Sequence, residues 1–245
     1  MNAIYTAASG LTAERQWLAT IGSNLAAANS PGYLAATDQF AAFPPVMVGR
    51  TASPGAPANS QLGSTSWGVA TLPAIDNPAS GLGLVSTGRM LDVGVAGPGF
   101  LTVATPTGTA YTKDGRLFLD SQGTLVTGQG DRVLSTTGAP IHLGTGPVSI
   151  AANGTITQNG AAVAQLAVVT LSGTLTSQPG NLYTGTAAPS PTSQIVQGAL
   201  NQSGVSLTQS ATAMIQAETA YQGLSTMVTE EATRLSEAAK LGVMA

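Results

Sequence analysis

Residues 206–242 read SLTQSATAMIQAETAYQGLSTMVTEEATRLSEAAKLG, and this stretch decides the fold class. Large apolar side chains recur at every seventh position, with a second apolar row, mostly alanine, between them. The first row is Leu207, Met214, Tyr221, Val228 and Leu235, and the second is Ala211, Ala217, Leu224, Ala232 and Ala238. Such a repeat is typical of a helix that packs against another helix in a coiled coil. We therefore predict a helix within residues 205–245.

The ends of this helix are also indicated by the sequence. Ser206 and Gln209 have the spacing of a capping box at a helix N-terminus. Gly242 follows the last apolar position, where glycine favours a helix stop.

The N-terminus carries a matching repeat. Ile4, Leu11, Leu18 and Leu25 are seven residues apart, with Ala7, Ile21 and Ala28 between them. Asn29-Ser30-Pro31-Gly32 then predicts a type II turn that ends the helix. Residues 1–33 are therefore predicted to be the antiparallel coiled-coil partner of residues 205–245. Ile4, Leu11, Leu18 and Leu25 would face Leu207, Met214, Tyr221, Val228 and Leu235 across the seam.

Residues 34–83 are rich in proline, glycine and serine, which disfavours helices and interior strands. The prolines are Pro44, Pro45, Pro54, Pro57, Pro73 and Pro78. We expect an extended connector that contacts a neighbouring subunit.

Residues 84–185 show the alternating pattern of an antiparallel β domain, with turn signals about every 8 to 12 positions. Asp114-Gly115 predicts a tight hairpin between 110–113 and 116–119, and Asn153-Gly154 and Asn159-Gly160 predict two more. Gly128-Gln129-Gly130 is interpreted as a hairpin connection. Residues 161–171 predict one long strand. Pro189 and Pro191 indicate a linker over 186–204. The fold class is α+β, with an antiparallel coiled-coil pair of terminal helices and a central all-β antiparallel domain.

Composition narrows the classes of function. Charged residues make up only 8% of the 245 residues, against roughly 25% in a usual soluble domain, and such a surface favours association with copies or partners. The net charge of −3 and the scattered basic residues give no footprint for nucleic acid. No apolar run is long enough to span a membrane. The N-terminus lacks a secretory signal, so any export needs a dedicated route.

Catalytic interpretations are weak, and we expect no enzyme activity, metal or cofactor. His142 is the sole histidine and lies in a strand-like segment without a nucleophile motif. Glu218, Glu230 and Glu231 raise the possibility of a carboxylate pair for glycan cleavage, but neighbours on a helix do not face one another. We interpret these acids as a solvated helix face.

Motifs along the whole chain resemble those of bacterial flagellar rod and hook proteins. The N-terminal motif consists of Ala8-Ser9-Gly10-Leu11 and the segment from Asn24 to Tyr33. Central motifs are Thr87-Gly88-Arg89, Leu91-Asp92-Val93, Gly97-Pro98-Gly99-Phe100, Ala110 to Gly115 and Gly123 to Thr127. The C-terminal motifs are Gln197 to Ser203, Met214-Ile215 and Ala220-Tyr221. The single β domain and modest length are most similar to the proximal or distal rod proteins.

This resemblance implies a structural subunit of the flagellar basal-body rod, a drive shaft that transmits torque and encloses the export channel. Its partners would be copies of itself, other rod and hook proteins, and the type III export apparatus of the flagellum. The subunit would lie in the periplasmic rod, exported without a cleaved signal peptide. The family's turn motif falls on Asn24, Asn29, Pro31, Gly32 and Tyr33.

Three positions depart from the family pattern. Leu34 stands where a basic residue is common, Gly204 where asparagine is common, and Thr219 where arginine is common. We expect these changes to alter polar contacts between subunits rather than the architecture.

Two other functions are compatible with parts of the sequence. An extracellular β-rich adhesion or glycan-binding module would suit the low charge, and a cell-wall hydrolase would suit passage through peptidoglycan. Neither accounts for matching heptads at both termini.

Overall fold

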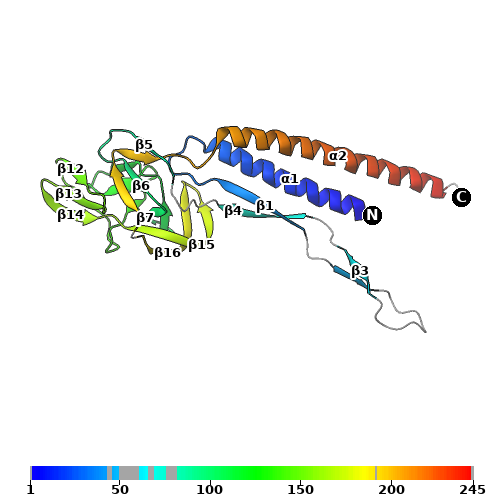
Figure 1. Ribbon diagram of the computed structural model, residues 1–245, viewed down its shortest axis with the longest axis horizontal. Coiled ribbons are helices and arrows are strands. Elements are labelled where there is room, and N and C mark those ends of the chain that lie inside the picture. Colours follow the sequence, from blue (N-terminus) through cyan, green and yellow to red (C-terminus); the bar gives the residue numbers. More distant parts are fainter. Residues whose placement is uncertain are drawn as a thin grey trace. The chain divides into compact units, whose positions relative to one another are not determined.

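The computed structural model describes residues 2–42, 46–49, 61–65, 69–75, 82–190 and 192–243. They form two compact units. The helical unit lies within residues 1–23, 37–73 and 208–245, and the β unit lies within residues 24–36 and 74–207. The predicted terminal helices and the central antiparallel β domain are confirmed (Figure 1).

The helices begin and end close to the predicted positions. Helix α1 spans Asn2–Ala26 and is followed by turns up to Gly32. Helix α2 spans Leu207–Val243, so Ser206 directly precedes its first turn, as predicted. The predicted stop at Gly242 is wrong, because the helix includes that residue. A glycine at the end of a long helix lowers its propensity without having to stop it.

On the helices, two residues of the second predicted row, Ile21 and Ala217, are more buried than the described residues of the first row. Ala13, Ile21 and Ala217 are buried, whereas Leu207 and Met214 are 52% and 40% exposed. Four other seam residues, Leu11, Leu18, Tyr221 and Val228, are half-buried, and Leu25 is exposed. The side chains of Ile4 and Leu235 lie outside the described residues.

Gly10 on α1 lies close to Leu224 on α2 within the helical unit. A Cβ atom added to Gly10 would lie 3.3 Å from Cδ1 of Leu224, so the two helices approach closely at that point. The absence of a side chain at Gly10 leaves room for Leu224.

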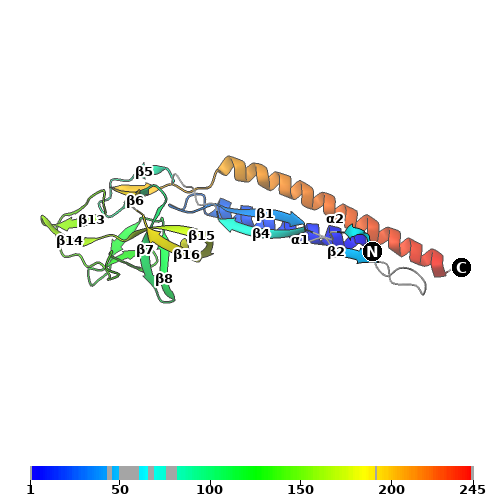
Figure 2. The same cartoon turned by 60° about the horizontal axis from the view of Figure 1, so that its bottom comes forward.

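The predicted connector contains strands. Strands β1 (Ala36–Ala42) and β4 (Val69–Ile75) form one two-stranded sheet (Figure 2), and β2 (Val46–Gly49) and β3 (Gln61–Thr65) form another. Every strand of a two-stranded sheet has a free edge, so Pro73 in β4 is tolerated there. The segment is thus extended, and its described strands are edge strands rather than the interior strands that the prolines disfavour. Pro44, Pro45, Pro54, Pro57 and Pro78 lie outside the described residues.

The largest sheet of the β unit has seven strands, in the order β15-β16-β8-β7-β11-β10-β9. Strand β15 also pairs with β7, so β7, β8, β16 and β15 close into a ring. The strands are β7 (Gly99–Thr105), β8 (Gly108–Thr112), β9 (Leu117–Leu119), β10 (Leu125–Thr127), β11 (Arg132–Val133), β15 (Val168–Gln178) and β16 (Leu182–Pro189).

Three small sheets complete the β unit. Strands β12 (Val148–Ile150), β13 (Thr155–Gln158) and β14 (Ala161–Gln165) form one. Strand β6 (Val93–Ala96) pairs with β17 (Gln194–Gln197), and β5 (Leu84–Ser86) pairs with β18 (Ala199–Asn201). Residues 186–204 thus contain paired strands, which corrects the predicted linker. These strands form because Val95 and Ile195 are buried as partners in register.

Two predicted hairpins are confirmed at the Asn-Gly pairs. Asn159 and Gly160 have φ values of 51° and 82° between β13 and β14, as a type I′ turn requires. Gly154 has a φ of 84° in the connection between β12 and β13. Gly128-Gln129-Gly130 connects the antiparallel strands β10 and β11, also as predicted.

The predicted hairpin at Asp114-Gly115 is wrong. Strand β8 pairs with β7 and β16, whereas β9 pairs with β10. Asp114 instead binds Arg116, with Oδ2 2.6 Å from the guanidinium. A Cβ atom added to Gly115 would lie 1.6 Å from the carbonyl oxygen of Val93. The absence of a side chain at Gly115 therefore allows its backbone to lie close to that of Val93.

The single long strand predicted over 161–171 is also wrong. The strand is interrupted at Leu166 and Ala167, and β14 and β15, on either side, belong to different sheets. The Leu166 amide donates to Gly154 and the Ala167 amide donates to Leu134. These two residues are thus paired with other segments, and Leu166 is buried.

Candidate functional site

The turn at Pro31 and Gly32 is the site that the family resemblance singled out, and it lies in the β unit. The Tyr33 amide donates to the Ser30 carbonyl, 3.3 Å away, and Gly32 has a φ of 67°. A type II turn needs a positive φ at its third residue, so both features fit such a turn over residues 30–33, one position later than the predicted stretch Asn29 to Gly32. A Cβ atom added to Gly32 would lie 2.2 Å from the backbone of Lys113. The turn therefore packs directly against the β unit.

Asn24 closes the loop that carries this turn. Its Oδ1 accepts hydrogen bonds from the Ala36 amide, at 2.9 Å, and from the Tyr33 hydroxyl, at 3.2 Å. Its Nδ2 donates to the Ala36 carbonyl, at 2.6 Å. One buried amide side chain thus joins the last turn of α1 to the residues where β1 begins.

A second set of hydrogen bonds ties the turn to strand β16. Asn181 Nδ2 donates to the Pro31 carbonyl at 2.8 Å. The Tyr183 hydroxyl donates to Asn181 Oδ1 at 2.7 Å and accepts from the Leu34 amide at 2.9 Å. Burial raises the pKa of the Tyr183 hydroxyl, so this group stays protonated and able to donate.

A third set joins the turn to the segment that leads into α2. The Gly32 amide donates to the Asn201 carbonyl at 2.9 Å, and the Gly204 amide donates to the Tyr33 carbonyl at 2.8 Å. The buried Asn201 side chain binds both the amide and the carbonyl of Val95, at 2.8 and 2.9 Å. The turn that follows α1 and the segment that precedes α2 are therefore hydrogen-bonded to each other and to the rest of the β unit.

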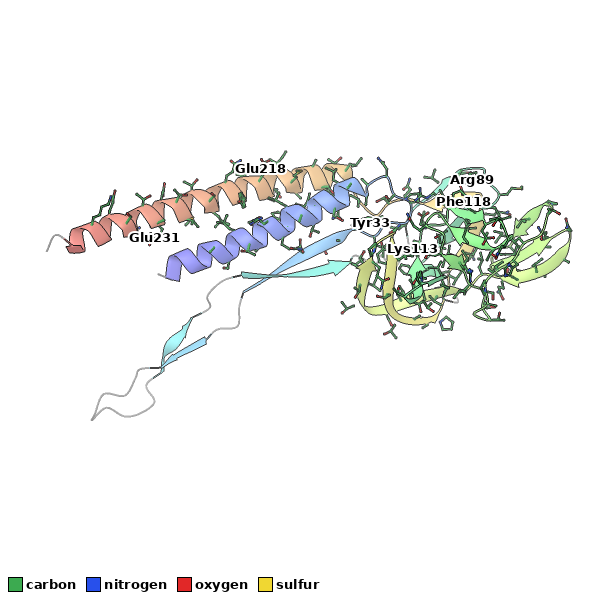
Figure 3. The ribbon with its side chains drawn as sticks, turned by 180° about the vertical axis from the view of Figure 1, so that it is seen from behind. Tyr33, Arg89, Lys113, Phe118, Glu218 and Glu231 are labelled. Atoms are coloured by element: carbon green, nitrogen blue, oxygen red, sulfur yellow. The ribbon has the colours of Figure 1, made fainter. Side chains whose placement is uncertain are left out.

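Lys113 lies beneath the turn as a fully buried cation. Its Nζ donates to the carbonyls of Gly97 and Gly99, at 3.0 and 2.7 Å, and lies 4.7 Å from the centre of the Phe100 ring. Burial lowers the pKa of this amine from 10.5 to about 8. Figure 3 labels Lys113 and Tyr33. Phe100 also packs edge-on against Tyr183, with ring centres 6.0 Å apart.

Two departures from the family pattern have structural explanations in the β unit. Leu34 is buried with Phe100, Leu171, Leu175 and Tyr183, so its apolar side chain serves internal packing. A Cβ atom added to Gly204 would lie 3.2 Å from both Leu82 and the Tyr33 carbonyl. The missing side chain thus lets Gly204 approach the turn closely.

An open groove of about 420 Å³ lies beside the turn. The exposed Asn29 and the half-buried Ala28 and Pro31 line it, together with Val85 and Leu200. Asn29 of the predicted turn motif lines this groove. Its side chain forms no hydrogen bond with the described residues.

The Thr87-Gly88-Arg89 motif forms a second polar cluster, labelled by Arg89 and Phe118 in Figure 3. The Thr87 hydroxyl donates to the buried Asp92 carboxylate at 2.6 Å. Arg89 lies 3.2 Å from the same carboxylate and 4.9 Å from the centre of the Phe118 ring. These contacts hold Asp92, the residue directly before β6, in place.

Sequence reasoning missed Asn181, Tyr183 and the role of Lys113. Pro179-Gly180-Asn181 signals a turn, and Asn181 has a positive φ of 61°. No local pattern indicates that this asparagine binds a carbonyl 150 positions away.

Glu218 and Glu230, which we interpret as part of a solvated helix face, are both exposed and lie far apart on α2. Glu218 and Glu230 are separated by twelve positions on α2, about 18 Å along a helix, which is beyond the separation of glycosidase carboxylates. Glu231 is paired with Arg234 at 3.2 Å. Nδ1 of His142 lies 3.2 Å from the Thr124 hydroxyl. The backbones of these two residues also form an isolated β-bridge.

Three family profiles match the chain. The profile "Flagella basal body rod protein" matches residues 4–33, and "Flagellar hook protein FlgE/F/G D1 domain" matches residues 94–158. The profile "Flagellar basal body rod FlgEFG protein C-terminal" matches residues 196–241. In the described part of the chain, no helix is long and apolar enough to cross a membrane.

Two of the similar proteins match nearly the whole chain, and a third matches part of it. The flagellar basal-body rod protein FlgG of Bacillus subtilis is 32% identical over 268 residues, which cover 98% of this chain and 99% of that protein. The flagellar basal-body rod protein FlgF of Mesorhizobium japonicum is 27% identical over 254 residues, covering 98% and 97%. FlgF of Rhizobium meliloti is 44% identical over 85 residues, about a third of each chain.

Proposed function

Because the chain belongs to the family of flagellar basal-body rod proteins and is a structural rod subunit, we propose that it assembles helically into a tube that transmits torque and encloses an export channel. The observation that carries this proposal is the similarity to a rod protein over 98% of the chain. The matches give no support to the adhesion alternative or to a hydrolase.

The proposed partners are other copies of this chain and other rod and hook proteins. A tube requires contacts in which one face of a subunit binds a different face of the next, because a self-complementary face closes the assembly as a dimer. We propose that the subunit reaches the rod through the flagellar export apparatus without a cleaved signal peptide.

The terminal helices are proposed to form an antiparallel coiled-coil pair in the assembled rod. The approach of Gly10 to Leu224 supports this arrangement. In an antiparallel register through this contact, Ile4 would lie opposite residue 230, within the range from Val228 to Leu235 that the heptads favour. The exposure of Leu207 and Met214 in the single chain suits burial of these side chains against neighbouring subunits.

The anchored Pro31 turn is proposed to hold residues 24–36 and the segment before α2 at constant positions within the β unit. Hydrogen bonds from Asn181, Tyr183 and Asn201 support this role. A rod subunit that transmits torque needs such attachments, because a loose loop would bend under load.

Deleting the gene in the source bacterium tests the function. We expect non-motile cells whose isolated basal bodies end within the rod when imaged by electron microscopy, and restoration by the wild-type gene. Motile deletion cells with complete basal bodies would contradict the proposal. The level at which the rod ends would also distinguish a proximal from a distal subunit.

A further inference from the structure

Helix α2 exposes an apolar ridge that belongs to neither predicted heptad row. Ile215 and Met227 are 68% and 61% exposed, more than any other large apolar side chain that the structure describes on the two helices. Residues four positions apart follow one ridge of a helix, so Ile215, Thr219, Gly223 and Met227 form a continuous line. Ile215 precedes Leu224 by about two and a half turns, so it lies on the side of α2 opposite the contact with Gly10 of α1.

The polar groups on this ridge are already satisfied within the helix. The Thr219 hydroxyl donates to the Ile215 carbonyl at 2.8 Å, and the Thr226 hydroxyl beside Met227 donates to the Gln222 carbonyl at 3.0 Å. Burial of a hydroxyl without a partner would be costly. The ridge also carries no charge. Another helix can therefore cover it without leaving a side-chain donor unpaired.

Helix α1 exposes a face of the opposite shape. Gly22 lies inside α1, is exposed, and has nothing within 4 Å of an added Cβ atom. The residues beside it on this face, Ala19, Ser23 and Ala26, are also exposed and small. A glycine inside a helix lowers the stability of the helix relative to alanine, and no contact with the described residues explains Gly22. This face is therefore shaped to receive a larger side chain.

The chain itself contains one contact of this kind. Leu224 of α2 lies over Gly10 of α1, with Cδ1 3.3 Å from the position of an added Cβ atom. A large side chain of α2 thus packs where α1 has a glycine. The exposed Ile215 and the open Gly22 are the two halves of a second such contact, and the single chain leaves both unfilled.

We propose that the Ile215–Met227 ridge of α2 packs on the small-residue face of α1 in a second copy, with Ile215 over Gly22. This inference rests on the proposed self-assembly and names the two surfaces that would direct it. Because the two surfaces differ, each copy can bind one neighbour through α2 and another through α1. Such a contact continues into a helical assembly, whereas a self-complementary face would close as a dimer.

Gly22→Ala separates this contact from ordinary helix stability. In the single chain the added methyl group meets open space and favours the helix, so the Tm of the dilute monomer should rise by about 2 °C. In the assembly the same methyl group crowds Ile215 of the neighbour, so the critical concentration for polymerisation should rise about tenfold. A glycine without a role in assembly would not move stability and polymerisation in opposite directions.

Ile215→Ala tests the other surface. Because Ile215 is exposed in the single chain, the Tm should stay unchanged, whereas the critical concentration should rise about tenfold as apolar burial is lost. Ser225→Ala is the matched control, since Ser225 is exposed on α2 outside the ridge, and it should change neither quantity. Circular dichroism gives the Tm, and sedimentation of the purified full-length chain gives the critical concentration.

Cross-linking identifies the partner, because the chain contains no cysteine. Polymers formed from an equal mixture of Gly22→Cys and Ile215→Cys chains should yield a disulfide-linked pair that contains one chain of each kind, identified by mass spectrometry. Absence of this mixed pair, or unchanged critical concentrations for both Gly22→Ala and Ile215→Ala, would overturn the inference. A wild-type chain that does not polymerise would instead count against the proposed self-assembly itself.

Discussion

Gly32 illustrates how one residue couples turn geometry to packing. Its φ of 67° is unfavourable for residues with a side chain, and a Cβ atom would lie 2.2 Å from the backbone of Lys113. The sequence predicts the first requirement, because Pro-Gly is a type II turn signal. The second depends on the backbone of Lys113, about eighty positions away, and has no local signature.

Gly32→Ala should therefore destabilise the chain by about 3 kcal/mol or more, measured by urea unfolding. Gly88→Ala is the matched control, because Gly88 has a similar φ of 72° and nothing within 4 Å of an added Cβ. This control should cost about 1 kcal/mol, the contribution of the backbone alone. Equal losses in the two variants would show that the contact with Lys113 has no energetic weight.

Lys113 predicts a pH dependence of stability. Its pKa is about 8 in the folded chain and 10.5 without burial, so between these values the unfolded chain binds more protons. The free energy of unfolding should then rise with pH across this window. The burial penalty is present in full below pH 8 and is lost as the amine deprotonates.

The expected gain between pH 7.5 and pH 9.5 is about 2 kcal/mol relative to Lys113→Met, in which this group cannot titrate. Comparing the two proteins cancels the titration of tyrosines and other lysines. A difference between them that stays constant with pH, or that falls, would contradict the depressed pKa of Lys113.

At the scale of elements, turn chemistry predicts the structure best where the two flanking strands are neighbours. Asn159-Gly160 adopts its hairpin, and the register of β13 and β14 follows from it. Asp114-Gly115 does not, because the β8 segment finds partners in β7 and β16. Long-range pairing overrides the local signal there, as it does at Leu166 and Ala167.

The heptads predict both terminal helices, but burial in a single chain follows the second predicted row in part and not the first. Among the described apolar side chains of the helices, Ala13 and the second-row residues Ile21 and Ala217 are buried, while Met214 and Leu207 of the first row are exposed. Heptad spacing identifies the face of a helix that packs against another helix. Which helix covers that face depends on the neighbouring subunits in the assembly. The seam residues therefore stay a prediction about the assembled rod.

Leu18→Asp and Val228→Asp test this seam. Both side chains are half-buried in the single chain, and a charge on a face buried by assembly is costly when unpaired. We expect loss of polymerisation and motility, while tryptic digestion still releases a folded β unit. Motile cells carrying either substitution would count against the seam, and Glu218→Gln is the neutral control.

At the scale of the whole molecule, the low charge and the two segments anchored to the β unit, after α1 and before α2, both favour assembly through the helices. A chain with 8% charged residues presents little repulsion to its own copies. The β unit holds the turn after α1 and the segment before α2 through Asn181, Tyr183 and Asn201. The helices are thereby left to make the contacts between subunits.

Electron cryo-microscopy of tubes assembled from the purified chain, or of rods that contain it, tests this account most directly. We predict a helical tube in which α1 and α2 line the central channel as an antiparallel pair, with the β unit outside them. A tube lined by the β unit, or closed dimers in which the helices remain exposed, would contradict it.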